Sequence, residues 1–120
     1  PYHLVAVEAP ITIAKAALFG LPTGSPIGHI SDVITVAKKD LKASEVLDGG
    51  GGYAVSGLIE RAEVSMTDGI LPLGLSAGAT LVKDVAKGST ILYSDVTVED
   101  SFVHTIRKMQ DITLWQGKMQ

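Results

Sequence analysis

Histidines are the side chains of this sequence best suited to catalysis or metal binding. They stand at His3, His29 and His104, and no two of them have the i, i+4 spacing with which one helix holds a metal ion. His29 lies in a predicted loop and His104 on a predicted helix surface, so we expect both to be solvated. His3 follows Tyr2 in an apolar stretch. A structural role for His3 is the simpler interpretation, but His3 is the candidate catalytic residue, and Tyr2 and His3 are the candidate substrate-binding residues.

Glycines and serines give no complete motif. The four glycines at 49–52 would need a third fingerprint glycine at 54 or 55 to form G-x-G-x-x-G, and the chain has Ala54 and Val55 there. A flexible or tightly packed turn is the better interpretation. Ser25 and Ser56 lie near glycines but lack the strand-to-helix turn of a nucleophile elbow. The sequence therefore predicts no cofactor site of its own.

The carboxylates and the absence of cysteine further limit the chemistry that the chain could perform. Glu60 and Glu63 share a helix face at most, and nothing near them indicates perturbed protonation. The chain has no cysteine, which excludes a disulfide framework and a thiolate metal site and fits a cytoplasmic protein. We predict no metal site, and we expect the chain alone not to be a complete enzyme.

Composition sets the class of protein. The 120 residues suit one domain, and 46% hydrophobic with 19% charged residues is a globular composition. Thirteen glycines and only 5% aromatics favour many tight turns and a loop-rich β architecture. The net charge of −3 argues against a nucleic-acid partner and against an anionic membrane surface. No apolar run reaches the roughly 20 residues that cross a bilayer.

The N-terminal segment is predicted to be a strand followed by a helix. Residues 2–7 are apolar and β-branched, which favours an extended strand. Pro10 suits a first helical position, and residues 11–19 then form a short helix that Gly20 closes. The loop at residues 20–31 is rich in proline and glycine. Because the first residue is Pro, we expect the chain to have been cut from a longer one.

The middle of the chain alternates short apolar runs with turns. Residues 32–37 and 80–82 are predicted strands, whereas residues 53–63 fit either a helix or a strand. Near the C-terminus, Asp100 or Ser101 can cap a helix. Its predicted core-facing residues are Phe102, Ile106 and Met109.

A repeat organises these elements. Residues 39–47 and 83–91 share Lys-Asp, an apolar residue, two linkers, a small residue, two further residues and an apolar residue. We expect each aspartate to accept hydrogen bonds from the amides just after it, as aspartate does in turns. Two similar surface turns arising by chance is the alternative; two copies after a strand favour a pseudo-symmetric β domain. A charged turn pair such as Lys83 and Asp84 is expected to be solvated.

The repeat resembles a known family. Residues 36–47, 71–81 and 83–96 look like SAF domains, which occur in type III antifreeze proteins, sialic acid synthases, flagellar P-ring chaperones and sugar-acid dehydratases. The resemblance implies a compact β-clip fold. One departure is Ser44, where SAF domains usually carry Gly, as the second copy does at Gly88. We expect Ser44 to avoid a positive φ through a slightly different turn.

A narrower resemblance covers most of the chain. Residues 2–4, 10–14 and 51–60 are similar to the C-terminal region of homoserine-dehydrogenase-like, NAD(P)-dependent oxidoreductases, some of which act as deoxyxylulose-phosphate-reductoisomerase-like enzymes. In that family a Rossmann domain upstream binds NAD(P). The resemblance implies that NAD(P) belongs to an upstream domain, and that this domain is the partner of the present chain. The sequence also leaves open whether copies of the chain assemble into a homo-oligomer.

These observations predict a mainly β fold with short helices. A β-clip (SAF-like) domain at residues 32–112 would follow an N-terminal strand-helix segment at 1–31, include a C-terminal helix, and precede a tail at 113–120. The predicted function is a C-terminal accessory domain of a larger oxidoreductase, supporting assembly or closure of the substrate site. The alternative is an independent module that binds a sugar acid or polyol; ice binding is a more remote third.

Overall fold

The computed structural model describes residues 4–116, with side chains for residues 4–113. Tyr2 and His3, the candidate site residues of the sequence, lie outside this range. The helices and strands, in chain order, are α1 (Val5–Phe19), β1 (Ser31–Ala37), β2 (Val55–Arg61), α2 (Ala62–Thr67), β3 (Thr80–Leu81), β4 (Val96–Thr97) and α3 (Phe102–Gln116). Short 3-10 turns stand at η1 (Leu73–Leu75) and η2 (Tyr93–Asp95).

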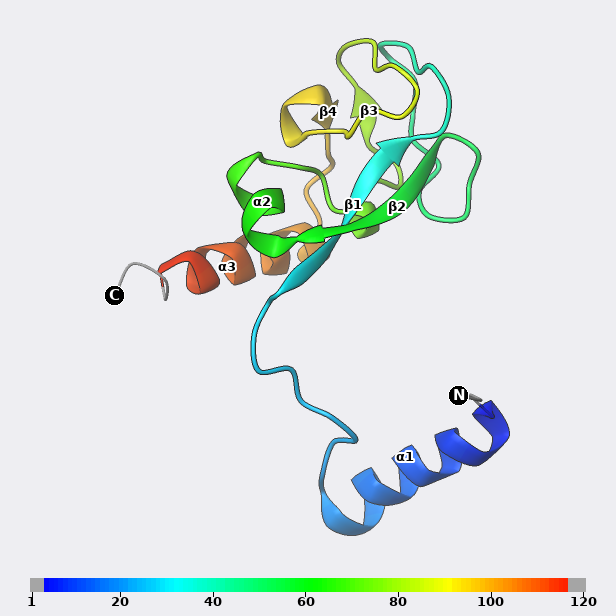
Figure 1. The fold of residues 1–120 in the computed structure, drawn as a ribbon, viewed down its shortest axis with the longest axis vertical. Coiled ribbons are helices and arrows are strands. Elements are labelled where there is room, and N and C mark those ends of the chain that lie inside the picture. The colour runs from blue at the N-terminus through cyan, green and yellow to red at the C-terminus, as the bar shows by residue number, and fades with distance from the viewer. Residues whose placement is uncertain (1–3, 117–120) are drawn as a thin grey trace.

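The fold is a small mixed α/β arrangement. β1 and β2 form one two-stranded antiparallel sheet, and β3 and β4 form a second one. α2 and α3 lie beside the β1–β2 sheet, while α1 stands apart at the far end of residues 20–30 (Figure 1). More of the described residues lie in helices than in strands, so the fold is mixed α/β and not mainly β.

The predicted N-terminal strand is wrong, because the helix begins earlier. α1 starts at Val5, and Glu8 already donates its backbone N–H to the Leu4 carbonyl at 2.9 Å. Pro10 lies inside the helix and not at its first position, so one backbone bond is missing there. The predicted end is confirmed, since Gly20 adopts the left-handed conformation at φ 62°. Alanine and glutamate in the first turns favour this longer helix.

The two Lys-Asp turns of the repeat interlock. Leu41 and Val85 occupy equivalent repeat positions, and each donates its N–H to the carbonyl of the other, at 2.8 and 3.0 Å. The same symmetry continues on both sides: Ser44 donates to the Leu81 carbonyl at 2.8 Å, and its counterpart Gly88 donates to the Ala37 carbonyl, also at 2.8 Å. The repeat is therefore a pseudo-twofold unit in which each copy completes the backbone pairing of the other.

The aspartates of the repeat also bind across this pseudo-twofold axis. Asp84 accepts a hydrogen bond from the N–H of Ala43 at 2.9 Å, and Asp40 accepts one from the N–H of Lys87 at 2.9 Å. The prediction that each aspartate binds the amides just after it is therefore wrong. Each carboxylate satisfies an amide of the opposite turn, which ties the two copies together.

Ser44 departs from the sequence expectation too. Its φ is +71°, beside +81° at the equivalent Gly88, so the first turn does not avoid the left-handed region. A side chain in that region costs roughly 1–2 kcal/mol. The backbone bonds on both sides of Ser44 hold the turn in the same shape as its glycine counterpart.

The core lies between the interlocked turns and the β1–β2 sheet. Its fully buried large side chains come from both halves of the repeat and from the segments that follow them: Leu41, Leu47, Val55, Leu71, Leu81 and Ile91. The ambiguous stretch at 53–63 resolves into the strand β2, which runs directly into α2. Glu60 thus lies in β2 and Glu63 in α2, so the two carboxylates do not share a helix face.

α3 confirms the predicted C-terminal helix but presents the opposite face. Ser101 caps it, accepting the N–H of His104 at 3.2 Å. The residues predicted to face the core are exposed: Phe102 at 79%, Ile106 at 48% and Met109 at 63%. The polar face of α3 contacts the domain instead. Within residues 4–116, no helix combines the length and the apolar character needed to span a membrane.

Candidate functional site

A cluster of charged side chains joins α3 to the start of β1. Arg107 donates from Nη1 to Asp32 Oδ1 at 3.2 Å and from Nη2 to Asp32 Oδ2, and from Nε to Asp111 at 2.8 Å. The Arg107 and Asp32 side chains are 14% and 10% exposed. A guanidinium that binds a carboxylate through two nitrogens is held in a fixed orientation, so this pair fixes the rotation of α3 about its axis.

Asp32 is the centre of this charged cluster. The hydroxyl of Ser65 in α2 donates to Asp32 Oδ2 at 3.3 Å, and the N–H of Val33 donates to Oδ1 at 3.0 Å. His29 Nε2 lies 3.9 Å from Oδ2. Burial alone would raise the pKa of Asp32, but the hydrogen bonds and positive charge of Arg107 outweigh it and hold the pKa below the usual value.

The geometry of the cluster suits attachment better than catalysis. The charge of Arg107 is balanced by two carboxylates, and the pKa of Arg107 is raised above its usual value despite partial burial. The Ser65 hydroxyl donates to a carboxylate and not to a histidine, so the nucleophile–base arrangement of hydrolases is missing from this cluster. The described residues of the cluster form a polar joint between β1, α2 and α3.

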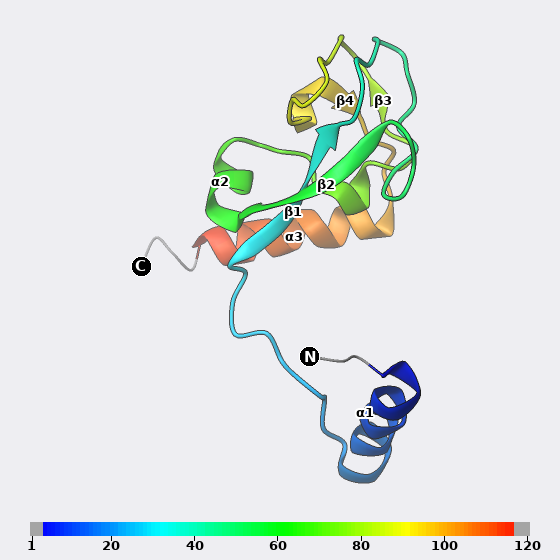
Figure 2. The same ribbon diagram turned by 45° about the vertical axis from the view of Figure 1, so that its right-hand side comes forward.

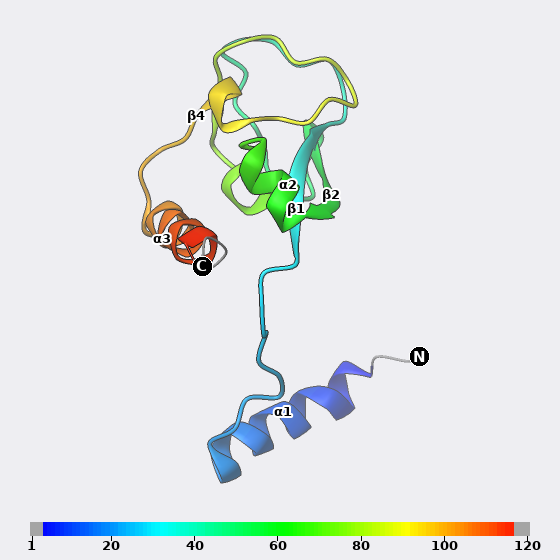
Figure 3. The same cartoon turned by 60° about the vertical axis from the view of Figure 1, so that its left-hand side comes forward.

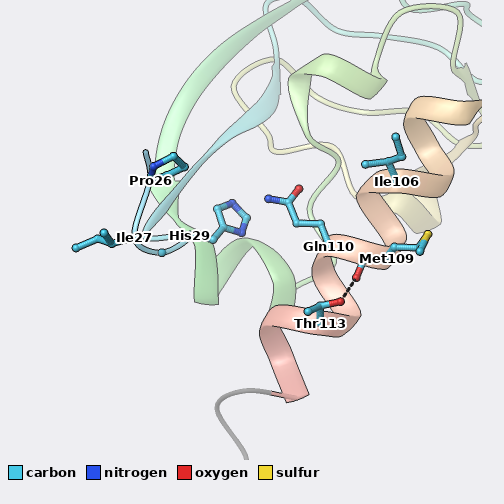
Figure 4. Close-up of a pocket in the computed structure, with 8 residues that line it drawn as sticks. Pro26, Ile27, His29, Ile106, Met109, Gln110 and Thr113 are labelled. Atoms are coloured by element: carbon cyan, nitrogen blue, oxygen red, sulfur yellow. Dashed lines mark hydrogen bonds between the residues drawn. The ribbon is translucent and has the colours of Figure 1, made fainter. Parts of the chain in front are cut away.

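A groove of about 650 Å³ runs beside this joint, between α3 and the segment that precedes β1. Its walls are mainly apolar, with three polar groups; they are formed by Pro26, Ile27, Gly28, His29, Ile106, Met109, Gln110 and Thr113. Figure 4 shows His29 and Gln110 on facing walls, with Ile106 and Met109 on the helix. The hydroxyl of Thr113 is already bound to the Met109 carbonyl at 2.8 Å.

Both described histidines differ from the sequence expectation, because neither is fully solvated. The His29 side chain is 14% exposed, and His104 is 7% exposed and stacked on Tyr93 with ring centroids 6.2 Å apart. The Nδ1 atoms of His29 and His104 are buried without a hydrogen-bond partner among the described residues. Burial raises the pKa of Tyr93 above its usual value. In the sequence, the i, i+3 and i, i+7 spacing of His104, Arg107 and Asp111 indicates that these polar residues share one face of α3, and this face contacts the rest of the domain.

The glycine run forms a tight turn around one carboxylate. Asp48 accepts hydrogen bonds from the backbone N–H groups of Tyr53 and Ala54, the latter at 3.1 Å. These bonds, that of Tyr53 first, hold the pKa of Asp48 below its usual value. A Cβ at Gly52 would stand 2.2 Å from the Asp48 carboxyl carbon, so any larger residue there would displace the carboxylate that holds the turn. The tightly packed alternative is thus confirmed, and the turn is structural.

A smaller hollow lies on the second turn of the repeat. About 280 Å³ in volume, it is lined by Lys83, Asp84, Val85, Ala86, Ser89, Thr90, Leu92 and Asp95. Lys83 and Asp84 are more than half exposed, yet Lys83 Nζ lies 2.7 Å from the buried carboxylate of Asp95. Burial would raise the pKa of Asp95, but Lys83 and the N–H of Leu92 hold it below the usual value. The polar lining of this hollow can donate to and accept from hydroxyl groups.

Comparison with known proteins gives no family: no protein-family model matches the chain, and no curated protein matches it in sequence. Among the described residues, no group of three or more histidine, aspartate or glutamate side chains could hold a metal ion.

Proposed function

We propose that this chain is an accessory module of a larger, cytoplasmic NAD(P)-dependent oxidoreductase, in which a preceding Rossmann domain binds the cofactor. The module supports assembly or closure of the substrate site and supplies no complete active site. The observation that carries the proposal is the interlocked repeat. Its aspartates, which belong to the pattern that carries the SAF resemblance, each bind a backbone N–H of the opposite turn and so hold the two copies together as a scaffold.

The arrangement of the repeat also supports a β-clip fold. In such a fold two related halves exchange backbone hydrogen bonds, and the pairs Leu41–Val85, Val36–Thr90 and Val46–Thr80 follow that scheme. The charged joint at Arg107 then serves to orient α3 on the module.

The reading frame upstream of Pro1 gives a direct test. A strand, a G-x-G-x-x-G segment and a helix there support the proposal. A complete polypeptide of this gene that contains no dinucleotide-binding segment overturns it.

A second candidate function is binding of a sugar acid or polyol at the hollow lined by Lys83, Ser89 and Thr90. The hydroxyl and charged groups there match the chemistry of such ligands. Thermal-shift screening against a panel of sugar acids tests it, with Thr90→Val as the variant that removes a hydroxyl. A ligand that stabilises the native chain and not the variant supports this candidate; no shift across the panel removes it.

A further inference from the structure

Two helices of this chain present apolar side chains to solvent. α1 buries none of its residues, and Figures 1 to 3 show it separated from the rest of the described chain. α3 turns its charged face inward and its apolar face outward. Contiguous exposed apolar surface on this scale marks an interaction site in soluble proteins.

The apolar side chains of α1 follow a heptad pattern. Exposed residues recur at alternating steps of three and four from the residue before the helix to the residue after its cap: Leu4, Val7, Ile11, Ala14, Leu18 and Leu21. This spacing places the four residues within α1 on one side of the helix, and Leu4 and Leu21 flank its two ends. Ile13 is equally apolar but projects from the opposite side, because two residues turn the helix by about 200°.

The apolar face of α3 is broader and covers about half of the helix, with Phe102, Ile106 and Met109 along its middle. Its exposed members are Phe102, Val103, Ile106, Met109 and Ile112, on a helix of 15 residues like α1. The groove of about 650 Å³ runs along Ile106 and Met109, and its other wall is the segment that leads from α1 into β1. A second helix laid in this groove would cover both the apolar face and the groove.

We propose that this helix is α1 of a second copy of the chain, exchanged reciprocally in a two-fold dimer. The linker argues against α1 of the same chain, because Leu21 and Ser25 precede prolines and such residues favour extended backbone. To fold back, α1 would have to reverse direction within residues 20–30, which run extended between α1 and β1 in Figure 1. An exchanged helix leaves the linker extended, which is the geometry of a domain swap.

The area of the exchanged contact suffices for a stable dimer. The apolar faces of α1 and α3 contain eleven apolar side chains, and a two-fold dimer buries both copies of the contact. At roughly 80 Å² of apolar surface per side chain, the total is on the order of 1,700 Å², and standard interfaces bury about 1,600 Å². This inference does not depend on the oxidoreductase proposal.

The absence of cysteine from the chain allows a clean cross-linking test. An equimolar mixture of the Ile11→Cys and Ile106→Cys variants, unfolded together, refolded and oxidised, should give a disulfide-linked species of twice the chain mass. The Ile11→Cys/Ile106→Cys double variant should give linked dimers as well. A double variant that oxidises within a single chain places α1 on its own α3 and overturns the proposal.

Light scattering after size-exclusion chromatography supplies the second test. We expect the unmodified chain to be a dimer, the Ile11→Glu variant a monomer, and the matched Ile13→Glu variant a dimer. A monomeric unmodified chain at high micromolar concentration contradicts the proposal. Partitioning of that monomer onto mixed phosphatidylcholine–phosphatidylglycerol vesicles would assign the apolar faces to a lipid surface instead.

Discussion

The carboxylate of Asp40 accepts the backbone N–H of Lys87, 47 residues away, at 2.9 Å. Its repeat counterpart Asp84 accepts the N–H of Ala43 at 2.9 Å. Between these two bonds lies the reciprocal backbone pair of Leu41 and Val85. The three contacts make the two turns one cooperative unit.

Removing either carboxylate should therefore weaken the same unit. We expect Asp40→Ala and Asp84→Ala each to lower the free energy of unfolding, since each removes the acceptor that ties an amide of the opposite turn. The loss of unfolding free energy in the double variant should differ measurably from the sum of the two single losses, because the bonds belong to one network. Urea unfolding of the unmodified chain, the two single variants and the double variant measures these free energies. Asp68→Ala, at an exposed position, is the control, with an expected change within about 0.5 kcal/mol.

Ser44 and Gly88, the equivalent positive-φ residues of the two turns, should respond in opposite directions when serine and glycine are exchanged. Ser44 bears the cost of a positive φ, so Ser44→Gly should raise the free energy of unfolding by roughly 0.5–1 kcal/mol after the greater chain entropy of glycine is offset. Gly88→Ser should lower it by about 1 kcal/mol. A Cβ at Gly88 meets no atom within 4 Å, so the effect is that of φ alone. Equal signs for both substitutions in urea unfolding would refute equivalence of the turns.

The repeat and the turns could be predicted from the sequence because glycine, aspartate and apolar spacing act locally. The partner of each aspartate could not, because Asp40 and Lys87 meet only when both halves fold. The face of α3 was mispredicted for a related reason. Apolar spacing shows that Phe102, Ile106 and Met109 share a side, but it does not show whether that side meets this chain or another surface. In the structure these three residues are exposed and Arg107 is turned inward, so the apolar side of α3 faces away from the core of this chain.

Arg107 should determine how α3 is attached. We expect Arg107→Met to lower the free energy of unfolding by about 1.5–3 kcal/mol, because Asp32 is left largely buried without its charged donor. Arg107→Lys should recover part of this, since one ammonium cannot reproduce the contacts to both Asp32 and Asp111. Lys108→Met, on the exposed side of the same helix, is the matched control. Equal stability of all three variants in urea would show that the pair does not hold α3.

The Arg107–Asp32 pair also predicts how the stability of the chain depends on pH in the acidic range. The pKa of Asp32 is lower in the folded chain than in the unfolded chain, so its contribution is complete above the unfolded value of roughly 3.9 and is lost as the pH falls through the folded value. The native chain should exceed Asp32→Asn in stability by a constant amount above about pH 5, and this difference should shrink below about pH 4. Chemical unfolding at a series of pH values measures it. A difference that grows on acidification would reverse the assigned sign.

Calorimetric titration with NADPH tests the proposed function most directly. The titration is performed on the 120-residue chain and, in parallel, on the complete polypeptide encoded by its gene. The accessory-module account predicts no saturable binding to the 120-residue chain and saturable binding to the complete polypeptide. Saturable, tight binding of NADPH by the 120-residue chain alone would contradict it.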